Sequence, residues 1–291
     1  MRHGKLTPYL FVLPMVVGLV VFRLGPVAVA FMAGFTKWNI QTPPELVGLA
    51  NYGEAIGSEI FWQVSKNTLV FTLIYVPGVM ILALVMAVMV NQKIRGIAFF
   101  RGLYFMPYIT AMVAVAMVWR WIFATRFGIL NFVLSNVFQI PDPPAWLADK
   151  AWALPALAIV AIWKHAGFQM LVFLAGLQGI PNSLYEAAAI DGANRRAQFF
   201  RITLPLLSPV TFFVFIITVI DAFKTFDVTY AMTGGGPNYA STTLAYSIYQ
   251  NAFIYGRMGY ASALAMLLLV FVGVTTLVSF RLKDRMVEYS L

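Results

Sequence analysis

The sequence contains no cysteine, which excludes disulfide bonds, thiolate nucleophiles, zinc–thiolate sites and iron–sulfur clusters. Histidine is almost as scarce, with His3 and His165 only. There is no H-E-x-x-H, no G-x-S-x-G and no G-x-x-x-x-G-K-S/T phosphate-binding loop anywhere in the chain. We therefore expect no catalytic site, no metal site and no cofactor. If the protein moves a solute at the expense of ATP, a different polypeptide must bind the nucleotide.

Charged residues are scarce as well. They make up 11% of the 291 residues, whereas a soluble globular protein has about 25%. Hydrophobic residues make up 61%, and the mean hydropathy is +0.81. Such a small number of charged residues cannot cover a surface that faces water. Most of the chain must therefore face lipid. This excludes a secreted domain, a cytosolic enzyme and a disordered regulator.

Six stretches are long enough to cross a hydrocarbon core of roughly 30 Å, which takes about 20 mainly apolar residues. We place them at residues 9–33, 68–90, 102–122, 152–178, 206–230 and 259–280. Residues 1–291 are thus predicted to form a single all-α membrane domain with six transmembrane helices. An even number of spans puts both termini on the same side of the membrane.

Lysine and arginine decide which side that is, because they gather in the cytoplasmic loops. The termini and two of the connections hold eleven of them: Arg2, Lys5, Lys93, Arg95, Arg101, Arg195, Arg196, Arg201, Arg281, Lys283 and Arg285. The other three connections hold five: Lys37, Lys66, Arg126, Lys150 and Arg257. We therefore predict a multi-pass protein of the cytoplasmic (inner) membrane with both termini cytoplasmic. The net charge of +9 then reflects topology, and no nucleic-acid partner is expected.

The first span has an alternative interpretation as a signal peptide, since Ala28-Val29-Ala30 has the small residues of a cleavage site. Its apolar stretch, however, is longer than a signal core of about 7 to 15 residues and continues past Ala30. Its removal would also leave an odd number of spans. We therefore expect the first span to be retained.

Ionisable side chains inside the predicted spans cost on the order of 3 kcal/mol each, so they are candidates for function. Lys164 and His165 lie in the fourth span, and Asp221 and Lys224 lie in the fifth. Asp221 and Lys224 are three residues apart and share one helix face. Arg23 and Arg120 lie near enough to span ends to act as interfacial anchors.

Two interpretations of this polar cluster remain open. In one, Asp221 pairs with Lys224 or Lys164 and merely holds two helices together. In the other, the polar groups line a water-filled path and form hydrogen bonds with a polar solute, while aromatics such as Phe168 and Phe223 contact sugar rings. Both interpretations require this face to point away from lipid.

The fourth-to-fifth connection, residues 181–205, is the most informative stretch of the chain. A helix is predicted to start there with Asn182 or Ser183 as its N-cap and Glu186 in its first turn. The small residues Ala187 to Ala189 leave a smooth surface against which another protein can pack. Gly192 then permits a sharp change of direction. We predict a short helix along the cytoplasmic surface with an alanine-rich face and one acid.

The spacing of this stretch resembles the EAA loop of permease subunits in binding-protein-dependent ABC importers. It comprises Glu186-Ala187-Ala188, three residues, Gly192, nine residues, Ile202, one residue and Leu204-Pro205. The rest of the chain is similar to the carbohydrate branch with maltose-type permeases, in residues 47–52 (VGLANY), 100–104 (FRGLY) and 233–237 (TGGGP). The fold implied is that of these importer permeases.

The resemblance also implies roles for particular residues. In such permeases the EAA loop is a coupling helix that sits in a cleft of the ATPase subunit. The ATPase-coupling residues carried over are Glu186, Ala187, Ala188, Asp191 and Gly192. Solute contacts are implied on the fourth and fifth helices, near Ala161, Lys164, His165, Phe168, Asp221 and Lys224.

The implied partners are a second homologous permease, two cytoplasmic ATPase subunits that bind ATP and Mg²⁺, and an extracytoplasmic solute-binding protein. The implied function is import of a di- or oligosaccharide. Lys164, His165 and Lys224 replace neutral groups that are common in the family, so glycerol 3-phosphate or a glycerophosphodiester is an alternative solute. An ion-coupled transporter that uses Asp221 or His165 as a proton relay is a further alternative, although it gives no reason for the EAA spacing.

Overall fold

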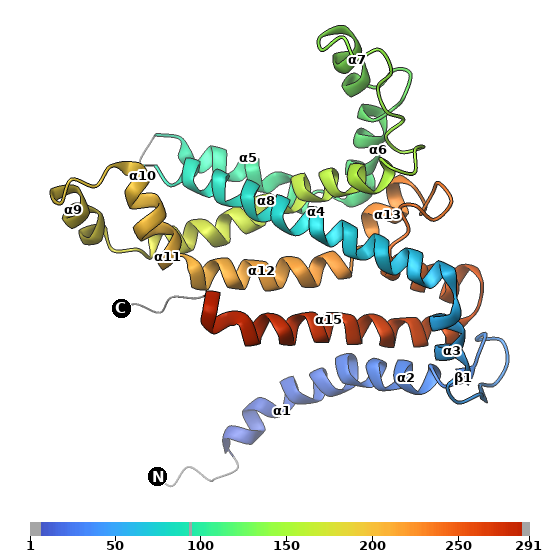
Figure 1. Cartoon of the computed structure of the whole chain (residues 1–291). Helices are drawn as coiled ribbons and strands as arrows, with labels where there is room; N and C mark the ends of the chain where they lie inside the picture. Colours follow the sequence, from blue (N-terminus) through green and yellow to red (C-terminus); the bar gives the residue numbers. More distant parts are fainter. Residues whose placement is uncertain (1–6, 93–94, 287–291) are drawn as a thin grey trace. The chain divides into compact units, whose positions relative to one another are not determined.

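The computed structural model describes residues 7–92 and 95–286, and helices dominate it. Four continuous helices are long and apolar enough to cross a membrane. They are Tyr9–Ala33 (α1 Thr7–Leu19, η1 Val20–Leu24 and α2 Gly25–Ala33), α4 (Glu59–Val90), α8 (Ala153–Gln178) and Met258–Lys283 within α15 (Met258–Met286). The all-α class predicted from the sequence is confirmed (Figure 1).

Two further candidate spans are bent. The first comprises α5 (Ile97–Ile109) and α6 (Met112–Ile122), whose axes differ by 95°. The second runs from Arg195 to Phe223 through α10 (Arg195–Gln198), η2 (Phe199–Thr203), α11 (Leu204–Leu206) and α12 (Ser208–Phe223), with a 63° bend before α12. Counting each bent pair as one span gives up to six spans in the described residues.

The bends change two helices that the sequence presented as continuous. Thr110 and Ala111 have extended backbones, with ψ of 137° and 132°, so the stretch 102–122 is two helices at nearly a right angle. In the stretch 206–230, α12 ends at Phe223 and α13 (Asp227–Met232) follows as a separate helix. Hydropathy alone does not show the break at Thr110, because both halves of that stretch are apolar, whereas the polar residues Lys224, Thr225 and Asp227 follow the end of α12.

The remaining elements are short. The helices are α3 (Ala50–Gly57), α7 (Ile129–Asn136), α9 (Asn182–Ile190), α14 (Leu244–Tyr249) and η3 (Gln250–Ile254). Strands β1 (Thr36–Lys37) and β2 (Glu45–Leu46) pair antiparallel, with Thr36 opposite Leu46. The chain divides into two compact units, residues 1–61 with 247–270 and residues 62–246 with 271–291, and the two are described separately.

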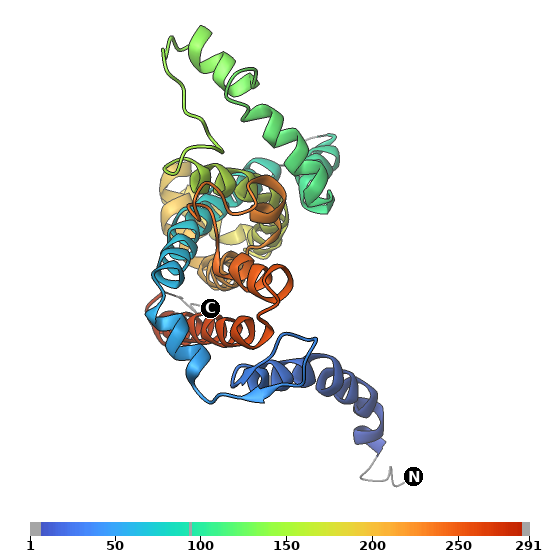
Figure 2. The same cartoon turned by 90° about the vertical axis from the view of Figure 1, so that its right-hand side faces the viewer.

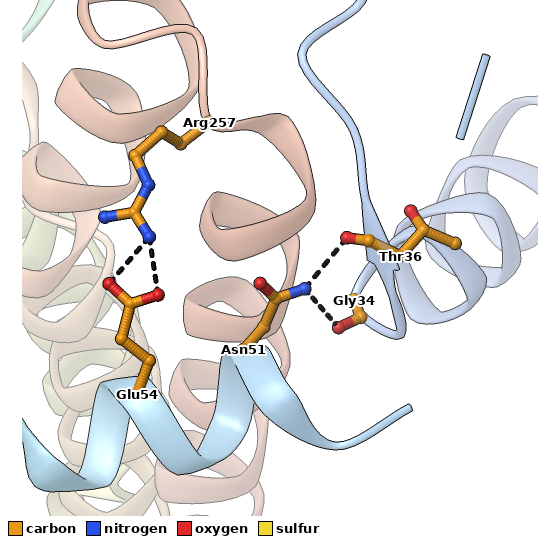
Figure 3. A network of polar contacts seen from close by, with 5 residues as sticks. All are labelled: Gly34, Thr36, Asn51, Glu54 and Arg257. Carbon is orange, nitrogen blue, oxygen red and sulfur yellow. Dashed lines mark hydrogen bonds and ion pairs between the residues drawn. The ribbon is translucent and has the colours of Figure 1, made fainter. Parts of the chain in front are cut away.

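A polar network joins three segments of the first unit (Figure 3). Asn51 of α3 donates from Nδ2 to the carbonyl oxygens of Gly34 and Thr36, both at 2.9 Å. One turn further along α3, both carboxylate oxygens of Glu54 accept from Nη2 of Arg257 at 2.6 Å. The network thereby fixes α3 to the end of the first span and to the start of α15.

The second unit is built around α8, which is the most buried of the four continuous candidate spans. It packs against α5 and α12. One apolar cluster fills the space toward the C-terminal end of α8 and includes Ala83, Ala87, Val90, Met170, Phe173, Leu174, Leu177, Ile180, Leu207 and Val214. Half of the length of α8 lies in this core. A displacement of the core at the C-terminal end of α8 is therefore expected to move α8 as well.

Within the second unit, α9 and α13 lie at opposite ends of α8 and α12 (Figure 1). At the α13 end, α6 packs against α13. Beyond this contact, α6 and α7, drawn in green, extend away from α8 and α12 in both views (Figures 1 and 2). Helix α9 and helix α6 therefore lie at the two ends of this helical unit.

Candidate functional site

The short helix predicted within residues 181–205 is present as α9, which begins at Asn182, so that Glu186 lies beyond the first turn and not within it as predicted. Its N-cap position is occupied by Pro181, and no side chain caps it, so neither Asn182 nor Ser183 takes the predicted role. Among the described residues, the first N–H groups of α9 therefore have no capping side chain, and the N–H of Leu184 donates to the carbonyl of Pro181 at 3.2 Å.

The C-terminal end of α9 is a Schellman motif. The N–H of Ala193 donates to the carbonyl of Ala188 at 2.8 Å, and the N–H of Gly192 donates to Ala189 at 3.1 Å. Gly192 has φ of +80°, a backbone conformation that glycine adopts without a Cβ penalty. The change of direction predicted at Gly192 is therefore present, and it fixes where the chain leaves α9.

One side chain anchors α9 to the body of the unit. The hydroxyl of Tyr185 lies 2.9 Å from Oγ1 of Thr203 in η2, and its ring packs against the apolar cluster. The following turn is fixed by Asn194, whose Oδ1 accepts from the N–H of Ala197 at 2.9 Å as the N-cap of α10. The helix is thus attached along one side through Tyr185.

The other side of α9 is open in the described structure. The side chains of Glu186, Ala187 and Asp191 are exposed, as is Gly192, and Ala188 is half-buried. Ile190 is an apolar side chain with 87% of its surface exposed. An apolar residue this exposed beside small residues and two carboxylates is typical of a surface that packs against another protein.

At the midpoint of the second unit, aromatic and polar side chains from three helices meet. Tyr75 of α4 has its hydroxyl 2.9 Å from Nδ1 of His165 on α8. Tyr108 of α5 lies edge-on to His165 and stacks on Phe168, with ring centroids 4.8 Å apart and planes at 16°. His165 and Phe168 thus lie in one cluster, and Tyr75 and Tyr108 are members of it that the sequence reasoning missed.

Lys164 lies beside this cluster but points at backbone. Its Nζ donates to the carbonyl oxygens of Pro107 at 3.3 Å, Tyr108 at 3.1 Å and Thr110 at 2.6 Å. Ala161, one turn earlier on α8, is fully packed. In the described structure neither side chain offers a free polar atom to a solute path, because the Lys164 ammonium group is bonded to backbone and the Ala161 side chain has no polar atom.

Among the described residues, Asp221 and Lys224 do not form the ion pair that one of the two interpretations of the sequence required. Both are exposed at the end of α12, and within the described residues no ion pair joins Asp221 to Lys224 or to Lys164. The carboxylate that interacts electrostatically with Lys164 and His165 is Asp227, in the first turn of α13. The helix-locking ion pair considered from the sequence is therefore not formed.

Two further groups were missed by the sequence reasoning. Asp227 lies within the predicted fifth span and carries the same signal as Asp221, but it was not named as a candidate. Gln169, next to Phe168, is buried and its Oε1 has no hydrogen-bond partner. In the described residues no group of three or more His, Asp or Glu side chains is placed to hold a metal ion.

The arrangement is that of a helical membrane protein with a short exposed helix at one end and a polar-aromatic cluster between its candidate spans. The sequence matches the family described as "Binding-protein-dependent transport system inner membrane component" over residues 58–287, and the chain belongs to this family. It is a permease subunit of an ABC importer, as the EAA spacing predicted.

Relatives match along nearly the whole chain. The probable ABC transporter permease protein YesP of Bacillus subtilis is 39% identical and covers 99% of this chain and 94% of its own length. The sn-glycerol-3-phosphate permease protein UgpA of Agrobacterium fabrum is 34% identical, covering 98% and 97%. The sulfoquinovosyl glycerol permease protein SmoG of the same species is 36% identical, covering 91% and 86%.

Two solved structures share the fold. A chain of a bacterial ABC transporter involved in import of the acidic polysaccharide alginate has a TM-score of 0.82 at 24% identity, covering 97% of this chain and 96% of that one. A chain of the bacterial alginate transporter in complex with a pentasaccharide-bound periplasmic protein has a TM-score of 0.83 at 23% identity, covering 98% and 96%.

Proposed function

We propose that this chain is one of two homologous permeases that together enclose the path of an ATP-driven importer for a sugar or a sugar-like polyol. Two cytoplasmic ATPase subunits bind ATP and Mg²⁺ and power the cycle, and an extracytoplasmic binding protein delivers the solute. In this proposal α9 and both termini face the cytoplasm, and α13 lies toward the outer side.

The observation that carries the proposal is the placement of α9. Its exposed surface of Glu186, Ala187 and Ile190 offers a docking face, while Tyr185 ties it to the core that contains the C-terminal half of α8. A pull on α9 is therefore transmitted to α8 and α12 as a rigid body. Rocking of this permease against its homologous partner would open the path alternately to the two sides of the membrane.

The cluster around Tyr75, His165, Tyr108 and Phe168 suits a solute with both apolar faces and hydroxyl groups. Aromatic rings contact the C–H faces of a sugar, and the half-buried His165 imidazole, oriented by buried Tyr75, offers a donor or an acceptor. The named relatives for sn-glycerol 3-phosphate and sulfoquinovosyl glycerol support a glycerol-containing anionic solute as the second candidate. The exposed ammonium group of Lys224 is a cation that can bind such an anionic solute.

The coupling role is tested with Glu186→Lys in the assembled importer. Reversing this charge opposes docking of the ATPase subunit, so ATP-dependent uptake in vesicles is expected to fall at least tenfold with the permease still inserted. Asp142→Lys is the matched control, since Asp142 is an exposed acid on the connection between α7 and α8. Unchanged uptake and ATPase recruitment in the Glu186 variant would refute the coupling role.

The orientation is tested with single cysteines, because the natural chain has none to interfere. Ser183→Cys in α9 and Asn136→Cys in α7 are both exposed positions. In intact cells a membrane-impermeant maleimide is expected to label position 136 and to spare position 183 until the membrane is opened. The reverse pattern would overturn the proposed topology.

An ion-coupled transporter predicts that the purified chain alone concentrates solute when an ion gradient is imposed. The proposal made here predicts no uptake by the chain alone, and uptake on ATP addition only when the ATPase subunits are present.

A further inference from the structure

The break in the third candidate span leaves backbone carbonyl groups that lipid cannot hydrogen-bond. The break after Ile109 leaves the last carbonyls of α5 without intrahelical N–H donors. The bilayer core supplies no water to satisfy them, so protein groups must do so. The hydroxyl of Thr110 donates to the Met106 carbonyl at 2.9 Å, which accounts for one of them.

Lys164 accounts for the carbonyl of Tyr108, shares that of Pro107 with the N–H of Thr110, and satisfies the carbonyl of Thr110 just beyond the helix. An ammonium group has three N–H donors, and here three carbonyls lie within reach, those of Pro107, Tyr108 and Thr110. The side chain is 7% exposed, so its charge is enclosed by the helix end. A cation at a helix C-terminus is also favoured by the negative end of the helix dipole.

The approach of α8 to α5 is what brings Lys164 to this place. One turn further on, Gly167 lies against the backbone of Tyr104 and Phe105 with no room for a Cβ. Residues three apart share a helix face, so Lys164 meets α5 one turn further along that helix. The close Gly167 contact and the Lys164 hydrogen bonds are parts of one helix–helix interface.

We propose that Lys164 is a positioning residue. Its hydrogen bonds stabilise the break in the third span at Thr110, and this break keeps α6 turned across the end of the unit against α13. Its protons are directed to backbone, and it acts on the solute path only through the shape it gives to α5 and α6. This deepens the proposed function, since it rests on the bent span forming part of the transport path.

The bend is measured by spin labels on cysteines introduced at Phe99 of α5 and Trp121 of α6, both exposed positions in a chain without natural cysteines. At 1.5 Å rise per residue, a continuous helix would separate the two backbones by about 33 Å, and a right-angle bend by about 22 Å. The complete importer with its partner subunits in nanodiscs is the sample.

Lys164→Met keeps the length of the side chain and removes its charge and donors. It is expected to lengthen the distance by about 10 Å in a substantial population. Lys164→Arg retains a charged donor fork and is expected to keep the short distance. Lys66→Met, an exposed lysine of α4, is the matched control and is expected to leave the distance unchanged.

Lys164→Gln keeps two N–H donors without the charge and supplies the measurement if the Met variant does not assemble, with a partial rise of the long population expected. An unchanged distance distribution in whichever variant assembles overturns the proposal. A solute-contact role for Lys164 would instead change the KM for uptake while the distance stays at the natural value, and that result overturns it too. The distances are read without transport, so they remain decisive even if the proposed function is wrong.

Discussion

The hydroxyl of Tyr75 and Nδ1 of His165 lie 2.9 Å apart and join α4 to α8 through one hydrogen bond. Tyr75 is almost fully buried, and its ring stacks on Phe71, with centroids 5.4 Å apart. The tyrosine is therefore rigidly held, and it sets the orientation of the imidazole ring. Since Tyr108 lies edge-on to the same imidazole, this orientation also shapes the aromatic face beside it.

Tyr75→Phe is expected to weaken solute binding without affecting assembly. The substitution keeps the ring and its stacking on Phe71 but leaves His165 without its partner. A hydrogen bond of this kind contributes about 1 kcal/mol, which corresponds to a roughly fivefold rise in KM. Uptake kinetics in vesicles measure the change, and Tyr9→Phe in the exposed first span is the control. An unaltered KM would show that the pair takes no part in the solute path.

Asp221→Asn combined with Lys224→Gln is expected to alter which solutes are transported and to leave the complex intact. The two side chains are exposed and form no ion pair with each other, so their removal breaks no bond between helices. Competition assays with neutral and anionic solutes measure the preference, and co-purification of the subunits measures assembly. Loss of assembly would favour a helix-locking role after all. Glu59→Gln with Lys66→Gln on α4 is the matched double control.

The sequence predicted the presence of α9 and the turn that ends it because these signals are local, although its N-cap was predicted one or two residues too late. The helix and the turn at Gly192 depend on residues within a few positions of one another. The Schellman hydrogen bonds close within α9 and the two residues that follow it. These hydrogen bonds need no residue from elsewhere in the chain. The anchor of α9 through Tyr185 does depend on a more distant partner, Thr203.

The polar cluster could be predicted only in part. The depth of Lys164 and His165 follows from hydropathy, but the partners of Lys164 are carbonyls that become available only because α5 breaks at Thr110. Hydropathy does not show that break, and the close approach of α8 at Gly167 beside it is a tertiary contact. Asp227 carries the same signal as Asp221, an ionisable side chain inside a predicted span, but its place beside the cluster could not be foreseen because α12 ends at Phe223.

Gly192→Ala is expected to destabilise the end of α9 by about 1 kcal/mol, because an L-residue at a φ of +80° is strained. The docking face would then be displaced, so solute transported per ATP hydrolysed should fall while the amount of inserted permease stays constant. Gly57→Ala is the matched control, since Gly57 lies in α3 with ordinary φ and open space around its Cβ position. Equal coupling ratios in the two variants would contradict the role given to Gly192.

The network of Figure 3 allows two kinds of polar contact to be compared in one place. Asn51 is buried and donates to two backbone carbonyls, so Asn51→Ala leaves the Gly34 and Thr36 oxygens without this donor. A buried group left unsatisfied costs roughly 1 to 3 kcal/mol.

The neighbouring ion pair is weaker, although its contacts are shorter. The side chains of Arg257 and Glu54 are 44% and 50% exposed, and solvent screening limits such pairs to about 0 to 1 kcal/mol. Asn51→Ala should therefore lower the thermal midpoint of the detergent-solubilised chain clearly more than Glu54→Gln. Raising the salt concentration should reduce only the effect of the Glu54 variant, because salt screens charges and not neutral hydrogen bonds. An equal or larger loss from Glu54→Gln would mean that the ion pair, and not the buried amide, holds α3 in place.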